Sequence, residues 1–223
     1  MSYNNASPHG NTGLDRVVQM ALGCADGVWY RYMLQKDPCG CALSSDETRA
    51  VIDGAVLTAN GMAKRITAQY GVLSPQELAG ELQLNLVYGR DELQGPYLYM
   101  GLYDSAARTI TVNESAVSQV TQLIGGNALD SVTPSSDIMD SVVLHEIFHA
   151  LEEENPGIYT RSQMLERSVL GIRYKRGLAG ASEVAAVQFS KSMAGMAYSP
   201  CIFERYLLLA LGHLSLGDLV PNI

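Results

Sequence analysis

The spacing of apolar residues predicts that the chain begins with helices. Apolar positions recur every three or four residues over 14–34 and again over 44–71, as on one face of a helix. The second range is the clearer helix, because it begins among Ser and Asp residues and ends at a glycine. The first range contains Gly23 and Gly27, which disfavour a continuous helix. The polar residues 1–12 are expected to be disordered.

After residue 71 the pattern changes to shorter elements. Ser74 followed by Pro75 is typical of a helix start, and it predicts a short helix over 74–83. The next residues, LNLVYG at 84–89, have the composition of a short strand. A sheet is therefore expected to begin directly after this helix.

Two further strands are predicted over 96–103 and 108–113, joined as a hairpin by residues 104–107. In the second of these strands apolar and polar residues alternate, so one of its faces should be exposed. A strand of this kind could lie at the edge of a sheet. The stretch 118–136 that follows is polar and rich in turn-forming residues, and it is expected to be irregular.

The C-terminal half is predicted to be helical again. One helix should begin at Ser136 or Asp137 and end by Asn155, because Pro156 cannot continue it. Further helices are expected over 162–174, 182–195 and 199–214. These elements together predict the α+β class, a mostly helical domain with a small antiparallel or mixed sheet packed on the helix 136–155.

Composition and charge narrow the classes of function. A chain of 223 residues that is 47% hydrophobic and 17% charged can fold around a core of its own. Its net charge of −8 argues against a surface that binds nucleic acid or anionic lipid. The first residues lack the basic and apolar regions of a secretory signal, and the longest apolar run, YLLLALG, is too short to span a bilayer. We therefore expect a cytoplasmic protein that does not bind nucleic acid or membranes.

The four cysteines are expected to be reduced thiols in such a compartment. Cys39 and Cys41, together with Cys24, could instead hold a second metal ion or take part in redox chemistry. Their C-x-C spacing is not the usual C-x-x-C of a zinc site. Ordinary thiols are therefore the preferred interpretation of these residues and of Cys201.

The stretch VVLHEIFHALEEEN, residues 142–155, contains two of the four histidines of the chain. Four residues of a helix turn through roughly 400°, so His145 and His149 should project from nearly the same face. Glu146 follows the first histidine in the H-E-x-x-H order of zinc peptidases. Two structural histidines beside a surface Glu are the alternative, but the apolar residues that flank the motif indicate a core helix and favour a metal site.

A catalytic zinc ion takes three protein ligands in tetrahedral geometry and leaves one position to water. His145 and His149 therefore need one more ligand. The metal lowers the pKa of the water to about 7. Glu146 would take the proton of this water and pass it to the leaving amine.

The known kinds of zinc peptidase differ in the identity of the third zinc ligand. In a metzincin a Gly and a third His would stand at positions 152 and 155, where this chain has Glu152 and Asn155, so that class is excluded. A Glu from a later helix is the other solution. Glu183 is preferred, because the small residues after it would let its helix approach the motif helix closely. The remaining alternatives are Glu166, Glu152 and Glu153.

Four segments in order, ELAGELQLNLVYG, GLYDSAARTITVN, VVLHEIFHALEEE and SEVAAVQFS, resemble the ImmA/IrrE metallopeptidases, minimal zinc peptidases of the gluzincin kind. The resemblance covers roughly residues 74–195. It implies that His145, His149 and Glu183 bind one zinc ion per chain and that Glu146 is the general base.

The resemblance also implies a domain organisation. A zincin-like metallopeptidase domain would occupy residues 73–223. A helical segment at 13–72 would precede it, after the polar residues 1–12.

The chain departs from the family pattern at Val187, where the family usually has Asn or Asp. That residue can orient a ligand histidine, so another group must do so here. The candidates are Asp137, Asp140 and Gln188. A peptidase also needs a donor that stabilises the oxyanion. Candidates for this role are Tyr159, Arg173, Tyr174 and His213.

The leading hypothesis is a zinc-dependent endopeptidase with a narrow protein substrate. The resemblance implies regulatory cleavage, often of a transcriptional repressor. An extended substrate is expected to bind beside strand 108–113. The alternatives are a binding or regulatory module that retains zinc without hydrolysing peptides, and an interaction protein in which the fold is only a scaffold. The intact Glu146 favours the enzyme, since a purely structural zinc site would not need it.

Overall fold

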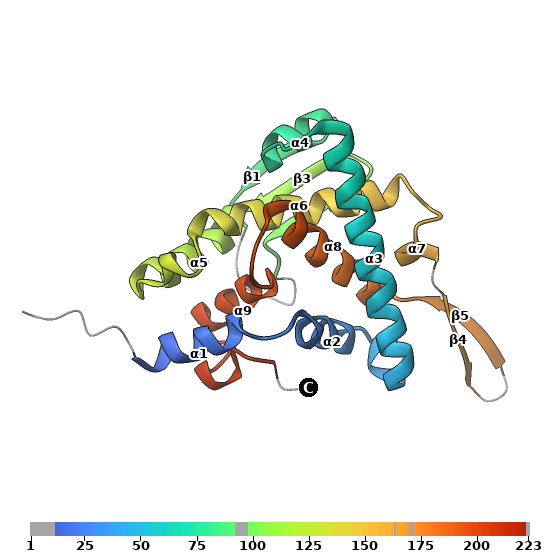
Figure 1. Ribbon diagram of the computed structural model, residues 1–223, viewed down its shortest axis with the longest axis horizontal. Coiled ribbons are helices and arrows are strands. Elements are labelled where there is room, and N and C mark those ends of the chain that lie inside the picture. The colour runs from blue at the N-terminus through green and yellow to red at the C-terminus, as the bar shows by residue number, and fades with distance from the viewer. Residues whose placement is uncertain (1–11, 92–97, 163, 170–171, 222–223) are drawn as a thin grey trace, which may run out of the picture.

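The computed structural model describes residues 12–91, 98–162, 164–169 and 172–221 (Figure 1). The fold is mostly helical and includes a three-stranded mixed sheet and a separate two-stranded sheet. The expected α+β class is confirmed at this level. Residues 1–12 are expected to be disordered, and all of them except Thr12 lie outside the described residues.

The N-terminal part of the chain forms three helices, α1 (Thr12–Leu22), α2 (Asp26–Lys36) and α3 (Ser45–Tyr70). The prediction of one helix over 14–34 is wrong, because the chain breaks between α1 and α2. Gly23 weakens the helix at this point, and Ala25 takes an extended conformation from which α2 starts. The 26-residue helix α3 confirms the second prediction.

Both α3 and α4 (Pro75–Glu81) begin with a capping box. In α4 the Ser74 hydroxyl accepts a hydrogen bond from the backbone N–H of Glu77, and the Glu77 carboxylate accepts one from the backbone N–H of Ser74. These bonds satisfy N–H groups that a helix start leaves without partners. The helix start predicted from Ser74 and Pro75 is confirmed, and strand β1 (Asn85–Gly89) follows as expected.

The main sheet contains β1, β2 (Gly101–Asp104) and β3 (Thr109–Asn113) in the order β1-β3-β2. β1 runs parallel to β3 and β2 runs antiparallel to it. The predicted hairpin is confirmed, but its first strand, expected over 96–103, begins only at Gly101, and residues 96–97 lie outside the described residues. β3 is the middle strand and not an edge. Ile110 and Val112 of β3 are fully buried. β2 is thus one of the two edges of this sheet.

The prediction that residues 118–136 are irregular is largely wrong, because α5 (Glu114–Gly126) covers the first half of this range. The side chain of Asn113 caps this helix by accepting hydrogen bonds from two backbone N–H groups of its first turn. Three apolar residues at four-residue spacing, Ala116, Val120 and Ile124, are fully buried and fasten the helix to the core. The polar residues between them face outward.

The motif helix is α6 (Ser135–Glu153), within one residue of its predicted start. The short helix α7 (Tyr159–Ser162) follows. The prediction of a helix over 162–174 is wrong: β4 (Met164–Val169) and β5 (Ile172–Gly177) form an antiparallel hairpin that projects from the helical body (Figure 1). Apolar and basic residues alternate along the start of β5, and this period of two favours a strand.

The remaining helices, α8 (Ala179–Ala194) and α9 (Cys201–Ala210), agree with the predictions for this part of the chain. Three short 3-10 helices, η1 (Gly40–Ala42), η2 (Leu129–Ser131) and η3 (Leu216–Asp218), complete the described elements. None of the helices in the described ranges combines the length and the hydropathy that crossing a membrane requires.

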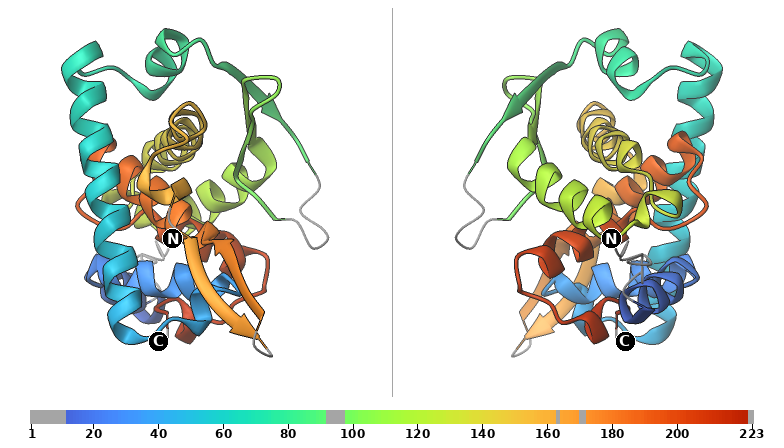
Figure 2. Two further views of the ribbon diagram at one scale, coloured as in Figure 1. Left: turned by 90° about the vertical axis from the view of Figure 1, so that its right-hand side faces the viewer. Right: turned by 90° about the vertical axis from the view of Figure 1, so that its left-hand side faces the viewer.

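Helix α6 lies at the centre of the molecule. Figure 2 shows it nearly end-on, with the sheet on one side and α8 and α3 on the other. Its residues Ile147 and Phe148 are fully buried, and the ring of Phe148 packs against that of Phe189 of α8, with 5.6 Å between the ring centroids. The packing of α8 on α6 thus brings together Phe148 and Phe189, which are 41 residues apart in sequence.

Candidate metal centre

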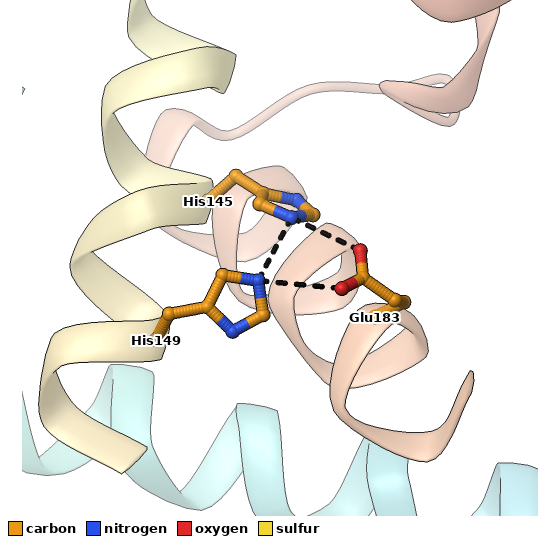
Figure 3. A group of neighbouring side chains, drawn as sticks. All are labelled: His145, His149 and Glu183. Atoms are coloured by element: carbon orange, nitrogen blue, oxygen red, sulfur yellow. Dashed lines mark hydrogen bonds and ion pairs between the residues drawn. The ribbon is translucent and has the colours of Figure 1, made fainter. Parts of the chain in front are cut away.

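His145 and His149 lie one turn apart on α6 and face α8 (Figure 3). Their Nε2 atoms are 3.1 Å apart, and both side chains are about one-fifth exposed. The helical spacing predicted that the two imidazoles would share a face. The structure brings the two Nε2 atoms toward a common point.

Glu183 of α8 completes the group. Its Oε2 atom lies 3.3 Å from Nε2 of His145, and its Oε1 atom lies 3.6 Å from Nε2 of His149. The neighbouring Ala185 and Ala186 are fully buried, and their small side chains allow α8 to lie close to α6. Among the candidate carboxylates whose side chains the structure describes, Glu183 is the one that lies near both Nε2 atoms.

The geometry of this group suits zinc. Its three ligand atoms lie within 4.8 Å of one another. Zinc–ligand distances of about 2.1 Å in a tetrahedron give separations of about 3.4 Å between ligands. The two Nε2 atoms are 3.1 Å apart, and Oε2 of Glu183 lies 3.3 Å from Nε2 of His145, so these two separations are close to this value. The contact with Nε2 of His149, at 3.6 Å, is made by the other carboxylate oxygen, Oε1. Two imidazoles and one carboxylate are also a ligand set of catalytic zinc sites, and they leave one tetrahedral position open.

The four cysteines take no part in this group. All are free thiols, and Cys201 is buried. Among the described residues, the side chains that together could bind a metal ion are those of His145, His149 and Glu183. Burial raises the pKa of the Cys201 thiol to about 12, so this cysteine is protonated at neutral pH.

In the absence of metal, His145 and Glu183 form a charged pair. Burial alone would lower the pKa of His145, but the hydrogen bond to Glu183 and the negative charge of that residue raise it to about 9. Burial alone would raise the pKa of Glu183, but its hydrogen bond to His145 and the charge of that residue lower it to about 2. A metal cation that replaces the proton on His145 would be attracted by the same negative charge of Glu183.

Glu146 follows the first histidine and lies on a different side of α6, against strand β2. Its side chain is buried, with 7% exposed. A Cβ atom added to Gly101 would come within 2.9 Å of Oε1 of Glu146 and within 2.7 Å of Cγ1 of Val142. Only a glycine lets the strand come this close to the carboxylate.

A cleft of about 300 Å³ opens beside this group, and His145, Glu146 and Glu183 line it. Residues 98–101 form part of its wall, so the segment that leads into β2 borders the site. The expectation that strand 108–113 is the edge beside the site is wrong, because β3 is covered by a neighbour on each side. Much of the remaining wall is apolar, from Met33, Val142, Val187, Phe203, Leu207 and Leu208.

Two of the other third-ligand candidates, Glu152 and Glu153, have different partners. Glu153 forms an ion pair with Arg161. Glu152 faces the Nδ1 side of His149, at 3.6 Å, and not the Nε2 atoms. The side chain of Glu166 lies outside the described residues.

The oxyanion candidates are not brought to the cleft in the part of the chain that the structure describes. The hydroxyl of Tyr159 donates to the carbonyl of Ala50 in α3, and its ring packs against Gly54. His213 follows α9 and does not line the cleft. The side chains of Arg173 and Tyr174 lie outside the described residues.

The three residues expected to orient a ligand histidine interact with other groups instead. Asp137 accepts a hydrogen bond from the Tyr198 hydroxyl at 2.6 Å. Gln188 donates to Asn60 at 2.8 Å and accepts from the hydroxyl of Tyr30. Asp140 is partly buried, which raises the pKa of its carboxyl, and the charge of Asp137 adds to this effect. The contacts of these three residues therefore do not include a ligand imidazole in the described structure.

Two residues outside the sequence-based candidates for this role, Ser182 and Glu152, contact His149. The Ser182 hydroxyl lies 3.3 Å from Nδ1 of His149 and hydrogen-bonds to Glu152 at 2.7 Å. The helical spacing of three residues between His149 and Glu152 was a usable signal, since such pairs share a helix face. Nothing in the sequence pointed to Ser182 except that it directly precedes Glu183.

Comparison of the chain with protein-family models, curated proteins and solved structures gives no match. The function of this site is therefore inferred from its residues, their geometry and the sequence motif.

Proposed function

We propose that this chain is a zinc-dependent endopeptidase of the gluzincin kind, related to the ImmA/IrrE metallopeptidases. One observation carries the proposal. Two imidazole nitrogens and a carboxylate converge within 4.8 Å, while Glu146, adjacent to the first ligand, lines a cleft together with His145 and Glu183. A structural zinc site has no use for a further carboxylate in that position.

His145, His149 and Glu183 would hold the ion. Zinc bound there supplies Lewis-acid chemistry, because it lowers the pKa of water and polarises a carbonyl group. Glu146 accepts a proton from the attacking water and donates it to the departing amine nitrogen. Its burial between α6 and Gly101 holds the carboxylate in place for both transfers.

The substrate is a protein or peptide in an extended conformation. Strand β2 is an edge of the sheet, and residues 98–101 line the cleft. An extended peptide can add to such an edge through main-chain hydrogen bonds. The apolar wall of the cleft would then receive an apolar side chain of the substrate. A net charge of −8 is unfavourable for a nucleic-acid partner.

The test uses Glu146→Gln as a trap. This variant keeps the size of the side chain but cannot take a proton from water, so it should retain zinc and bind substrate without cutting it. Proteins that co-purify with the variant from a cell extract are then incubated with the wild type, with the variant, and with the wild type plus a chelator. Glu153→Gln is the matched control, because it changes a neighbouring exposed carboxylate that pairs with Arg161.

Cleavage by the wild type and by the Glu153→Gln control alone supports the peptidase. Equal cleavage by Glu146→Gln would remove Glu146 from the mechanism. A wild-type protein that holds zinc and captures a partner without ever cutting it would favour the zinc-retaining binding module.

A further inference from the structure

The imidazole of His149 has a second contact on the side that faces away from the convergent Nε2 atoms. Its Nδ1 atom lies 3.3 Å from the hydroxyl oxygen of Ser182 in α8. That hydroxyl donates a hydrogen bond of 2.7 Å to Oε2 of Glu152. The direct distance from Nδ1 to Oε2 is 3.6 Å, which is too long for a hydrogen bond. Ser182 therefore bridges the two residues.

The direction of these hydrogen bonds determines where the imidazole carries its hydrogen. An ionised carboxylate can only accept, and a serine hydroxyl has a single hydrogen to donate. Because Ser182 gives this hydrogen to Glu152, its oxygen is left to accept one from His149. Nδ1 of His149 then carries the hydrogen, and Nε2 presents a lone pair toward His145 and Glu183. This is the tautomer that a metal ion at the Nε2 atoms requires.

The environment of Glu152 supplies a hydrogen-bond donor to each of its carboxylate oxygens. Its side chain is 7% exposed, and the Thr160 hydroxyl donates a hydrogen bond to its other oxygen. Both carboxylate oxygens thus have a hydroxyl donor.

We propose that Ser182 and Glu152 are positioning residues that fix the tautomer and the ring orientation of His149 through this hydroxyl-bridged chain. The proposal rests on the zinc site proposed above and adds a determinant of its metal affinity. Ser182 and Glu152 would also replace the Asn or Asp that the family usually has at position 187, where this chain has the apolar Val187.

The arrangement also couples the two helices of the site. Ser182 directly precedes Glu183, so one turn of α8 carries both a proposed ligand and the residue that orients another. His149 and Glu152 are three residues apart on α6. The hydrogen bonds across the helix interface therefore hold α6 and α8 in the alignment that brings the three ligand atoms together.

The experiment measures zinc affinity by competition with a chromophoric chelator for wild type, Ser182→Ala and Glu152→Gln. Loss of such an outer partner typically weakens metal binding by about 10- to 100-fold, and we expect this range for both variants. Ser182→Thr retains the hydroxyl and should bind zinc within about threefold of wild type.

Two controls match the chemistry of the changes. Ser192→Ala removes an exposed hydroxyl on the same helix, and Glu153→Gln neutralises the neighbouring carboxylate. Both should bind zinc as the wild type does. Thermal unfolding in the presence of a chelator shows that each variant is folded. Wild-type affinity in Ser182→Ala, or equal weakening in Ser182→Thr, would overturn the proposal.

A second measurement separates this proposal from the proposed function. The nitrogen-15 chemical shifts of the His149 ring, recorded without metal in mildly alkaline buffer, report its tautomer. We expect the Nδ1–H form in the wild type and a mixture in Ser182→Ala. A predominant Nε2–H form in the wild type would overturn the proposal. A wild-type protein that binds no zinc would instead contradict the proposed function, while the ring shifts would still test the hydrogen-bond chain.

Discussion

Gly101 of β2 lies directly against Glu146 of α6. A methyl group at position 101 would come within 2.9 Å of the carboxylate oxygen. The backbone of an edge strand thus borders the proposed general base, with no side chain between them. This contact links two parts of the proposed mechanism, because the strand that would bind the substrate also confines the carboxylate that would move the proton.

We predict that Gly101→Ala lowers peptidase activity while zinc binding is retained. The added methyl group must displace Glu146 or Val142, and a general base that is out of position loses a contribution of about 10²-fold or more. The measurement is kcat/KM on the protein captured by Glu146→Gln, together with the zinc content per chain. Gly89→Ala on β1 is the control, since a methyl group there meets only Thr111, at 3.8 Å. Full activity in Gly101→Ala would show that the close approach is not needed.

The second prediction concerns the metal. Purified protein should contain about one zinc ion per chain, because three protein ligands and an open position suit this ion. Double replacement of His145 and His149 by Ala should abolish binding, as measured by elemental analysis after dialysis. His213→Ala, a change at a histidine that does not line the cleft, should have no effect. Stoichiometric zinc in the double variant would place the site elsewhere, most plainly on the cysteines.

The third prediction compares carboxylates. Glu183→Ala should weaken zinc binding by at least about 100-fold, because it removes a direct ligand and not an outer partner. Glu166→Ala and Glu153→Ala should bind zinc nearly as the wild type does. Affinities from chelator competition provide the ranking. If Glu166→Ala is the most damaging of the three, the assignment of Glu183 fails.

The fourth prediction is a pH dependence of the metal-free protein. The folded-state pKa of His145 is about 9, against an ordinary value of 6.5, so its stabilising effect is complete below pH 6.5 and is lost as the pH rises to about 9. Glu183, with a pKa of about 2 against 4.5, stabilises above pH 4.5 and loses this effect as the pH falls toward 2. The pair therefore stabilises the fold most between pH 4.5 and 6.5.

The expected loss between pH 6.5 and 9 is about 1 kcal/mol, because Glu183 is half-exposed and solvent screens the pair. Thermal unfolding in the presence of a chelator across this range measures it. Glu183→Gln is the comparison, and its stability should vary less over the same interval. Identical pH profiles for the two proteins would contradict the prediction.

The sequence by itself predicted the elements whose signals are local. Ser74 and Pro75 indicated the start of α4, and the alternation of Ile110 and Val112 with threonines indicated β3. The pairing of His145 and His149 was also predictable, since it follows from the geometry of a single helix.

Three elements were misjudged where local signals were weak or conflicting. The polar composition of α5 concealed three buried positions four residues apart, and its helix depends on packing against the core. The break before Asp26 and the hairpin at 164–177 were both taken for helix, because residues with helical propensity occur in both.

Some features of the site likewise follow from local sequence, and others depend on tertiary packing. The motif placed two proposed ligands and Glu146 on one helix, but it left the proposed third ligand open among several carboxylates. Only the packing of α8 on α6 brought Glu183 to the Nε2 atoms and Ser182 to the other side of His149. Likewise, only the strand order showed that β2, and not β3, borders the cleft. Spacing along a helix determines which residues share a face, whereas contacts between distant segments depend on how whole elements bury their apolar surfaces against one another.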